Sequence, residues 1–355
     1  MHIPDGYLSP STCAALYGGI LASWYLCLRR LKRVLLTRVV PLISVFAAFA
    51  FVVMMFNIPL PGGTTGHALG VTIATIVLGP WGGVLATSLA IALQALLFGD
   101  GGITTLGANC FNMAVIGSAV AYGCYRLLAS QAPVGSRRRI VAAGVAGYLA
   151  ANASALAAAI ELGIQPALFH DSAGAPLYAP YPLKIAIPAM MIGHLTLAGM
   201  AEAIISAGLV AYLQVADPAL LRQTSGLGGR DLGSTGSLRR LWATVALLLV
   251  LTPLGILATG KAWAEWSASD FTTSNTRAQI TASSGNQTPP PVAPSGLQRM
   301  ASVWTSPFPS YAPAFVRSAA LGYLLSAMFG VGICVFIALL AQERLRARPR
   351  LEQDS

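Results

Sequence analysis

The chain begins with two residues that can chelate a metal ion. Met1 supplies a free α-amine, and His2 supplies both a backbone nitrogen and an imidazole. These three nitrogens close two fused rings around one ion and leave a fourth corner open. A planar nitrogen site of this kind is the geometry of Ni(II) and Cu(II). Because the ligands must lose protons, we expect metal binding to weaken in acid.

A second histidine lies in a glycine-rich segment and can supply the fourth ligand. The segment runs Pro61-Gly62-Gly63-Thr64-Thr65-Gly66-His67-Ala68-Leu69-Gly70. Its glycines permit tight turns, and Thr64 and Thr65 can hydrogen-bond the His67 ring or a water and so fix the tautomer of the ring. The alternative is an interfacial histidine packed among apolar neighbours. We favour the ligand, because the orientation predicted below puts His67 on the same membrane face as Met1.

Two further ionisable residues, His194 and Glu202, lie eight residues apart in one apolar stretch. The helical period places them near one face, and ionisable groups inside a membrane are costly enough to indicate function. They can relay a proton, transmit the state of the metal site, or bond to neighbouring helices. Asp100 is expected to be a turn residue whose charge can attract cations, and His170 is expected to be solvated in a loop.

The composition is that of a protein that crosses a membrane many times. Only 10% of the 355 residues are charged, and the mean hydropathy is +0.67. Apolar runs close to the ~20 residues that cross a bilayer recur along the chain. They predict nine spans, at roughly 11–28, 39–56, 68–79, 82–98, 108–128, 140–161, 184–213, 241–259 and 316–340. Gly and Pro mark a turn between the third and fourth spans, at Leu78-Gly79-Pro80-Trp81-Gly82-Gly83.

The basic residues predict an orientation. With nine spans and the N-terminus outside, only five of the 22 Lys and Arg residues lie outside, namely Lys184, Lys261, Arg277, Arg299 and Arg317. Cytoplasmic loops carry an excess of Lys and Arg, so the net charge of +10 indicates topology rather than nucleic-acid binding. The start of the chain lacks the basic region of a cleaved signal peptide, and His2 should block removal of Met1. We therefore expect a free amine on the outer face of a bacterial inner membrane.

The predicted fold is an all-α polytopic membrane protein in two parts. Residues 1–213 form a seven-span core, 214–240 a flexible cytoplasmic linker, and 241–355 a two-span module whose C-terminus is cytoplasmic. The module has a long external loop at about 260–315. This loop is rich in Ser, Thr and Pro, so we expect its middle to be disordered. The five cysteines show no CxxC spacing and are expected to pack in or beside the spans.

These residues resemble the substrate-binding S-components of cobalt and nickel energy-coupling-factor transporters, the CbiM/NikM group. The resemblance covers most of residues 1–213 and rests on His194 with Glu202 and on four motifs, which are Met1-His2-Ile3-Pro4-Asp5-Gly6-Tyr7-Leu8, Gly66-His67-Ala68-Leu69-Gly70, Leu78-Gly79-Pro80-Trp81-Gly82 and Gly101-Gly102-Ile103-Thr104-Thr105-Leu106-Gly107-Ala108-Asn109. It implies that Met1, His2 and His67 hold the metal. Residues expected to support these ligands or couple them to the helices are Asp5, Thr64, Thr65, Asn109, His194 and Glu202.

The tail resembles the two-span accessory subunit of these transporters, fused here as in nickel-type MN fusions. The matching segments are Gly260-Lys261-Ala262-Trp263-Ala264-Glu265-Trp266 and Pro294-Ser295-Gly296-Leu297-Gln298. In the second segment Ser295 and Gln298 replace the two acidic residues of the family pattern, Pro-Asp-Gly-Leu-Glu. We expect the module to serve transport more than binding, with Trp263, Trp266 and Trp304 anchoring its loop at the outer interface.

Energy for transport is expected to come from partners. The chain contains no Gly-x-x-x-x-Gly-Lys-Ser/Thr phosphate loop and is not expected to be an enzyme. The resemblance implies a transmembrane coupling subunit and a pair of ATP-binding subunits. Two stripes of small residues suit either close contact with that coupling subunit or internal helix packing, namely Ala14, Gly18 and Ala22 in the first span and Ser44 and Ala48 in the second.

The predicted function is capture and ATP-driven uptake of Ni(II), with the metal as transported ligand and no cofactor. Co(II) uptake for cobalamin synthesis is the alternative, because the same mechanism serves both ions in the family that the chain resembles. A vitamin-binding S-component or a secondary transporter would leave the Met1-His2 chelator unexplained. An intramembrane metalloenzyme requires a His-Glu-x-x-His helix or an activated nucleophile, and the sequence offers neither.

Overall fold

The computed structural model describes residues 1–35, 39–222 and 235–351 of the chain. Six helices in these residues are long and apolar enough to cross a membrane, namely Pro10–Leu31, Val71–Phe98, Arg137–Leu168, Leu183–Ala216, Leu238–Leu257 and Ala319–Ala341. A shorter apolar helix covers Val40–Met54. The chain is therefore an all-α, multi-pass membrane protein, which confirms the predicted fold class. The count of nine spans and the side on which each terminus lies stay predictions.

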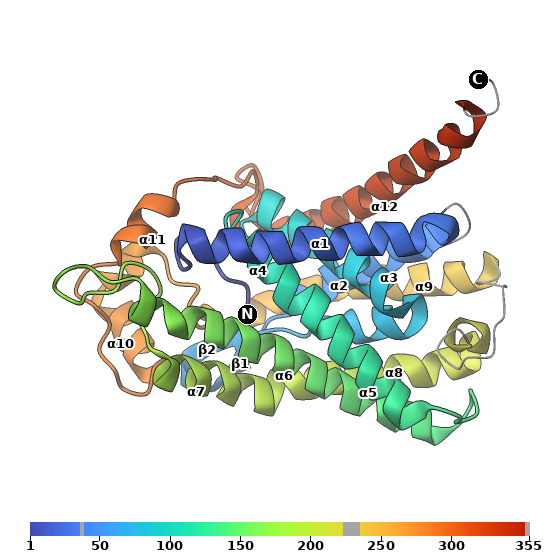
Figure 1. The fold of residues 1–355 in the computed structure, drawn as a ribbon, viewed down its shortest axis with the longest axis horizontal. Coiled ribbons are helices and arrows are strands. Elements are labelled where there is room, and N and C mark those ends of the chain that lie inside the picture. Colours follow the sequence, from blue (N-terminus) through green and yellow to red (C-terminus); the bar gives the residue numbers. More distant parts are fainter. Residues whose placement is uncertain (36–38, 223–234, 352–355) are drawn as a thin grey trace.

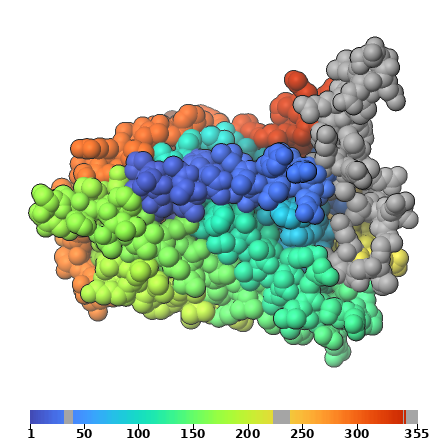
Figure 2. Space-filling model, viewed as in Figure 1, coloured from blue at the N-terminus to red at the C-terminus, as the bar shows by residue number. Residues whose placement is uncertain are grey.

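The helices form one elongated bundle with α2 (Val39–Met54) in its interior (Figure 1). From residue 45 to 54 every side chain of α2 is buried, because helices α3, α9 and α12 all pack around it. Helix α1 (Pro10–Leu35) instead runs along the surface of the bundle, as Figure 2 shows. The other long helices are α5 (Gly117–Ala129), α6 (Arg137–Leu168), α7 (Leu183–Gly193), α8 (Gly199–Ala216), α9 (Thr235–Leu251) and α12 (Ala319–Leu351).

Helix α3 (Val71–Leu93) reverses direction within its length. At Gly79 the backbone leaves the helical region, with φ 77° and ψ 171°, and Pro80 follows. A Cβ built on Gly83 would lie 3.1 Å from Thr75 Cα, so the two parts of α3 lie side by side. Glycine adopts a positive φ at little steric cost, which allows the turn. The sequence predicted a boundary at these residues, and the reversal explains why the apolar run before it is short.

Three π-helical stretches interrupt the bundle. They are η2 (Gln94–Phe98) after α3, η3 (Cys110–Ile116) between α4 (Leu106–Asn109) and α5, and η4 (His194–Ala198) between α7 and α8. Turns of this type occur frequently at functional sites. Here they adjoin Asp100, Asn109 and His194, three of the residues singled out in the sequence.

A small antiparallel hairpin ends directly before His67. Strand β1 (Ile58–Leu60) pairs with β2 (Thr64–Gly66) across the short helix η1 (Pro61–Gly63). Leu60 packs against both Gly66 and Gly193, since a Cβ on either glycine would lie 2.7 Å from Leu60 Cδ1. The hairpin is therefore held against the end of α7, and the long helical unit α7–η4–α8 positions the segment that contains His67.

The 260–315 loop is folded, and the prediction that its middle is disordered is wrong. It contains η8 (Ala268–Phe271), α10 (Ser274–Ser283), α11 (Ser295–Met300) and η9 (Pro309–Tyr311), drawn in orange at one end of the bundle in Figure 1. The carbonyls of the proline run have a partner: Arg277 donates to Pro289 O at 3.0 Å and to Pro290 O at 2.6 Å. A composition that cannot build a core by itself is thus ordered by the contacts of one half-buried guanidinium and by the surface beneath.

The tryptophans of this loop do not act together as interfacial anchors. Trp263 and Trp266 are 5% and 6% exposed and pack against each other and against Tyr181. Only Trp304 is substantially exposed, and its indole N–H donates to the carbonyl of Leu96 at 2.9 Å. The first two therefore form part of the core that joins the loop to the rest of the protein.

The predicted linker falls partly outside the described residues, which omit 223–234. Before it, α8 ends at Ala216 and a short helix η5 (Pro218–Leu221) follows. After the apolar part of α9 the chain continues as η7 (Thr252–Leu257) into the folded loop. All five cysteines are free, and four of them are buried, in agreement with a packing role.

Candidate metal centre

The N-terminal segment is buried inside the molecule. Met1, His2 and Ile3 are 3%, 2% and 0% exposed, and the N-terminus lies within the outline of the bundle in Figure 1. Both backbone groups of Ile3 are paired with one side chain: its N–H donates to Asn109 Oδ1 at 2.8 Å, and its carbonyl accepts from Asn109 Nδ2 at 3.0 Å. Asn109 therefore fixes the chain that supplies the ligands rather than the ligands themselves.

Further contacts tie this segment to the loop between η2 and α4. The Gly102 N–H donates to the carbonyl of Ile3 at 3.0 Å. The Asp5 carboxylate accepts from the backbone N–H of Ile103 at 3.1 Å and of Thr104 at 2.7 Å. Asp5 thus has the same role as Asn109, and the two residues hold the N-terminal segment in place.

Gly102 lies too close to this segment to tolerate a side chain. A Cβ on Gly102 would stand 2.3 Å from the backbone nitrogen of Asp5, whereas a Cβ on Gly123 in α5 meets nothing within 4 Å. Adding a carbon atom to a tightly packed site typically destabilises the packed arrangement by about 1–3 kcal/mol. We therefore expect Gly102→Ala to weaken divalent-metal binding about tenfold in equilibrium dialysis and the control Gly123→Ala to leave it unchanged. Equal affinity in the two variants would contradict the close approach.

The two predicted histidine ligands meet at this buried end. His67 Nε2 lies 3.2 Å from His2 Nδ1, and the ring centroids are 5.0 Å apart. Nitrogens that bind one ion at right angles, with bonds of about 2.0 Å, stand about 2.8 Å apart. The observed separation is close to that value, so one ion can bridge His2 Nδ1 and His67 Nε2 with little movement. The amine and amide of the Met1-His2 chelate lie on the same buried segment.

The tautomer of His67 follows from a backbone contact. Its Nδ1 lies 3.0 Å from the carbonyl oxygen of Ala68. A carbonyl only accepts, so Nδ1 carries the proton and Nε2 keeps a lone pair for a metal. In the described residues the hydroxyl of Thr64 donates to Pro61 O, and Thr65 pairs through its backbone N–H with Lys261 O at 3.2 Å. Support of the His67 ring by the threonines, directly or through a water, stays a prediction.

Burial keeps both imidazoles in the form that binds metals. Desolvation, assisted by the nearby Met1 ammonium, lowers the pKa of His2 to about 3. The same two causes, with desolvation the larger, lower the pKa of His67 well below its usual value. A neutral imidazole is the ligand form, so protons compete poorly for these two rings at neutral pH.

Two carboxylates face the nitrogen donors. Asp100 Oδ1 lies 3.1 Å from His2 Nδ1, and Glu265 Oε1 lies 3.8 Å from the Met1 amine. Burial raises the pKa of Glu265, and the Met1 ammonium opposes the rise. The sequence indicated Asp100 only as a turn residue that attracts cations, and it assigned no role to Glu265. The only feature that could have drawn attention to Glu265 was its acidic side chain within the tryptophan-rich 260–266 segment.

A cavity of about 570 Å³ borders these groups. It is lined by His67, Asp100 and Glu265 and by aromatic residues of the fused module, including Tyr311. The Tyr311 hydroxyl donates to Asp100 Oδ2 at 2.7 Å, which holds the carboxylate at the cavity wall. Carboxylates in a cleft concentrate cations, so the cavity provides a negatively charged approach to His67.

His194 and Glu202, in the α7–η4–α8 unit, make their hydrogen bonds to backbone groups and not to Met1, His2 or the His67 ring. His194 Nδ1 contacts Met190 O at 2.8 Å, and its Nε2 has no hydrogen-bond partner in the described part of the chain. Glu202 accepts from backbone N–H groups at the start of α3, at 2.7 Å from Leu69 and 2.9 Å from Gly70. His170 is exposed, and its Nδ1 lies 3.1 Å from the carbonyl oxygen of Asp171.

Comparison with known proteins places this arrangement in a family. Residues 2–220 match the profile of CbiM, described as "Cobalt uptake substrate-specific transmembrane region". The fused nickel transport protein NikMN of Rhodobacter capsulatus is 53% identical over 337 residues, which cover 94% of this chain and 95% of that protein. The probable fused nickel transport protein LarMN of Lactiplantibacillus plantarum is 43% identical over 276 residues, which cover 76% of this chain and 79% of that protein.

A solved structure is also similar. A crystal structure titled as a transition metal transporter superposes with a TM-score of 0.58 at 47% sequence identity, covering 64% of this chain and 100% of that one. The family profile, these relatives and the spanning helices agree with one another. The chain therefore belongs to the CbiM family of multi-pass transmembrane metal-transport proteins.

Proposed function

We propose that this protein is the substrate-capture subunit of an ATP-driven energy-coupling-factor importer, with Ni(II) as its substrate. The observation that supports the proposal most directly is the 3.2 Å separation of His2 Nδ1 and His67 Nε2 beside the buried Met1 amine. Together with the His2 amide these groups offer four nitrogens to one ion. A planar set of nitrogens suits Ni(II) and Cu(II).

Nickel is favoured over cobalt by two observations. Beside the Asp100 and Glu265 carboxylates, the candidate donors are four nitrogens, and a set of four nitrogens matches the planar preference of Ni(II). The fused C-terminal module also has its counterpart in the Rhodobacter capsulatus protein, whose name specifies nickel transport. Co(II) remains the second candidate, because a relative 34% identical over 285 residues is named the cobalt transport protein CbiM of Geobacter sulfurreducens.

Coupling to ATP hydrolysis requires a surface for a membrane partner, and α1 offers one. Ala14, Gly18 and Ala22 are exposed on α1, and a Cβ on Gly18 would meet nothing within 4 Å. Small residues let two helices approach closely. The alternative stripe is unsuitable, since Ser44 and Ala48 are buried within the bundle. We therefore assign the contact with a transmembrane coupling subunit, and through it with a pair of ATP-binding subunits, to α1.

Metal binding by point variants tests the proposal. Wild-type protein should bind one Ni(II) in equilibrium dialysis with a square-planar absorption band, and bind Co(II) more weakly. His67→Ala should lose the band and most of the affinity, because the fourth nitrogen is gone. His170→Ala is the matched control, since His170 is exposed and remote from the centre. Tighter binding of Co(II) than Ni(II) would favour the alternative, and wild-type protein that binds neither ion would refute the proposal.

A further inference from the structure

Glu202 is a buried carboxylate whose partners lie on a different helix. It is 0% exposed and projects from α8 toward the first turn of α3. Its Oε2 accepts from the N–H groups of Leu69 at 2.7 Å and Gly70 at 2.9 Å, and its Oε1 lies 3.4 Å from the N–H of Thr72. Burying a carboxylate in a membrane protein is costly unless it is paired, and these donors provide the compensation.

The start of α3 depends on this carboxylate. Helix N-termini leave several N–H groups without partners inside the helix. At α3 the capping position is Gly70, with φ 68°, and no side chain there caps the helix. Glu202 supplies the missing acceptor from α8, and its negative charge is favourable at the positive end of the helix. The carboxylate therefore fixes where α3 begins relative to α8.

The same peptide group joins Glu202 to the metal-facing histidine. The N–H of the Ala68–Leu69 peptide donates to Glu202 Oε2, and its carbonyl accepts from His67 Nδ1 at 3.0 Å. A hydrogen bond on one side of a peptide polarises the group and strengthens the bond on its other side. The chain of contacts runs from the carboxylate, through one peptide, to the ring whose Nε2 faces His2. In many metal sites a carboxylate accepts directly from the histidine and orients its ring. Here one peptide group stands between the carboxylate and the ring.

We propose that Glu202 is the positioning residue for His67, which it orients and strengthens as a metal ligand through the Ala68–Leu69 peptide. The inference rests on the proposed function, because it requires His67 to bind the metal. It also gives the α7–η4–α8 unit a direct mechanical link to the site. A displacement of α8 that withdraws Glu202 would release the peptide, turn the His67 ring and weaken one of the four metal bonds.

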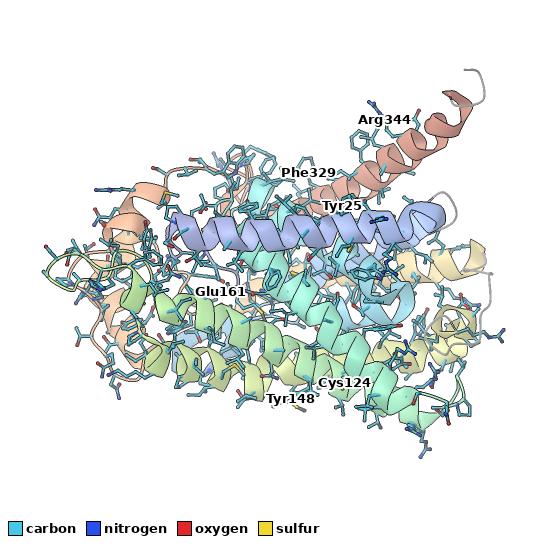
Figure 3. The ribbon with its side chains drawn as sticks, in the orientation of Figure 1. Tyr25, Cys124, Tyr148, Glu161, Phe329 and Arg344 are labelled. Carbon is cyan, nitrogen blue, oxygen red and sulfur yellow. The ribbon has the colours of Figure 1, made fainter. Side chains whose placement is uncertain are left out.

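A matched pair of glutamates tests this assignment. Glu161 on α6, labelled in Figure 3, is half-buried. Its carboxylate accepts from Asn112 Nδ2 at 2.7 Å, and it forms no hydrogen bond with residues 67–72 in the described part of the chain. Loss of a group that orients a metal ligand typically costs about 10- to 100-fold in affinity. Glu202→Gln should therefore weaken Ni(II) binding by about that factor and shift the nickel absorption band. Glu161→Gln should change neither.

A double-variant cycle distinguishes positioning from a general structural role. If Glu202 acts through His67, then Glu202→Gln should cause no further loss of affinity in protein that already contains His67→Ala. An equal loss in both backgrounds would overturn the proposal. Glu202→Asp keeps the charge but withdraws it from the Leu69 N–H, so it should bind Ni(II) with intermediate affinity, and it replaces Glu202→Gln if the latter does not fold. Wild-type affinity in Glu202→Asp and Glu202→Gln would refute the inference alone, whereas wild-type protein that fails to bind Ni(II) would refute the proposed function.

Discussion

One residue added before Met1 should abolish high-affinity nickel binding. The extension converts the Met1 α-amine to an amide, which must lose a proton before it can bind an ion, and it moves the free amine one residue further from His2. It also adds volume where Met1 is 3% exposed and its amine lies 3.8 Å from Glu265. Loss of a group that merely supports a ligand costs about 10- to 100-fold in affinity, so loss of the ligand itself should exceed that. Equilibrium dialysis with Ni(II), with His2→Ala in parallel, measures the effect.

The control for this prediction is the same extension at the other end of the chain. A residue added after Ser355 leaves the amine free and should preserve both affinity and the nickel absorption band. Enzymatic removal of the N-terminal extension should restore binding, which excludes misfolding as the cause. Protein that retains its extension, binds Ni(II) with full affinity and still requires His67 for that affinity would show that the Met1 amine is not a ligand.

The candidate nitrogen ligands could be identified in the sequence because their chemistry is local. Met1 and His2 form a chelator by covalent connection alone, and His67 stands out within a short glycine-rich segment. The carboxylates could not be found this way. Glu265 comes within 3.8 Å of the Met1 amine only because the 260–315 loop folds over the N-terminal segment. The Asp100 carboxylate is held beside His2 by a hydrogen bond from the Tyr311 hydroxyl. These residues lie far apart in the sequence, so no local pattern predicts the contact.

The fold shows the same division between local and distant causes. Apolar length predicted the spanning helices, and Gly79 with Pro80 predicted the reversal inside α3, because both signals act through the backbone nearby. Composition failed for the 260–315 loop, where Arg277 satisfies the carbonyls of prolines twelve and thirteen residues away. The π-helical stretches also escaped prediction, since an extra residue in a helical turn leaves the apolar periodicity almost unchanged.

The folded 260–315 loop packs against the N-terminal segment. The hydroxyl of Tyr7 donates to the carbonyl of Trp266 at 2.8 Å, and Gly6 packs so tightly on α11 that a Cβ there would lie 2.6 Å from Leu297 Cα. Leu297 belongs to the segment in which Ser295 and Gln298 replace acidic residues. The contact between Gly6 and Leu297 is made by backbone atoms. It therefore does not depend on the acidic side chains that Ser295 and Gln298 replace.

Removal of the module should leave the nitrogen donors in place but open the site. Protein truncated after Arg222 keeps Met1, His2 and His67, so we expect the square-planar absorption band to persist. It loses the Tyr7 contact and Glu265, which hold the N-terminal segment from one side. Differences in affinity between related complexes arise mainly from dissociation rates, and we expect Ni(II) to dissociate about tenfold faster. Stopped-flow mixing of the nickel complex with excess chelator measures this rate.

Two point variants in the full-length chain separate the causes of faster release. Tyr7→Phe removes only the hydrogen bond to Trp266, and Glu265→Gln removes only the charge beside the amine; each should give part of the acceleration. Cells that also express the coupling and ATP-binding subunits should accumulate less Ni(II) with the truncated protein, because an ion that escapes outward is lost before transport. Release as slow as in the full-length protein would show that the loop does not close the site, and loss of the absorption band would make the module part of the ligand set.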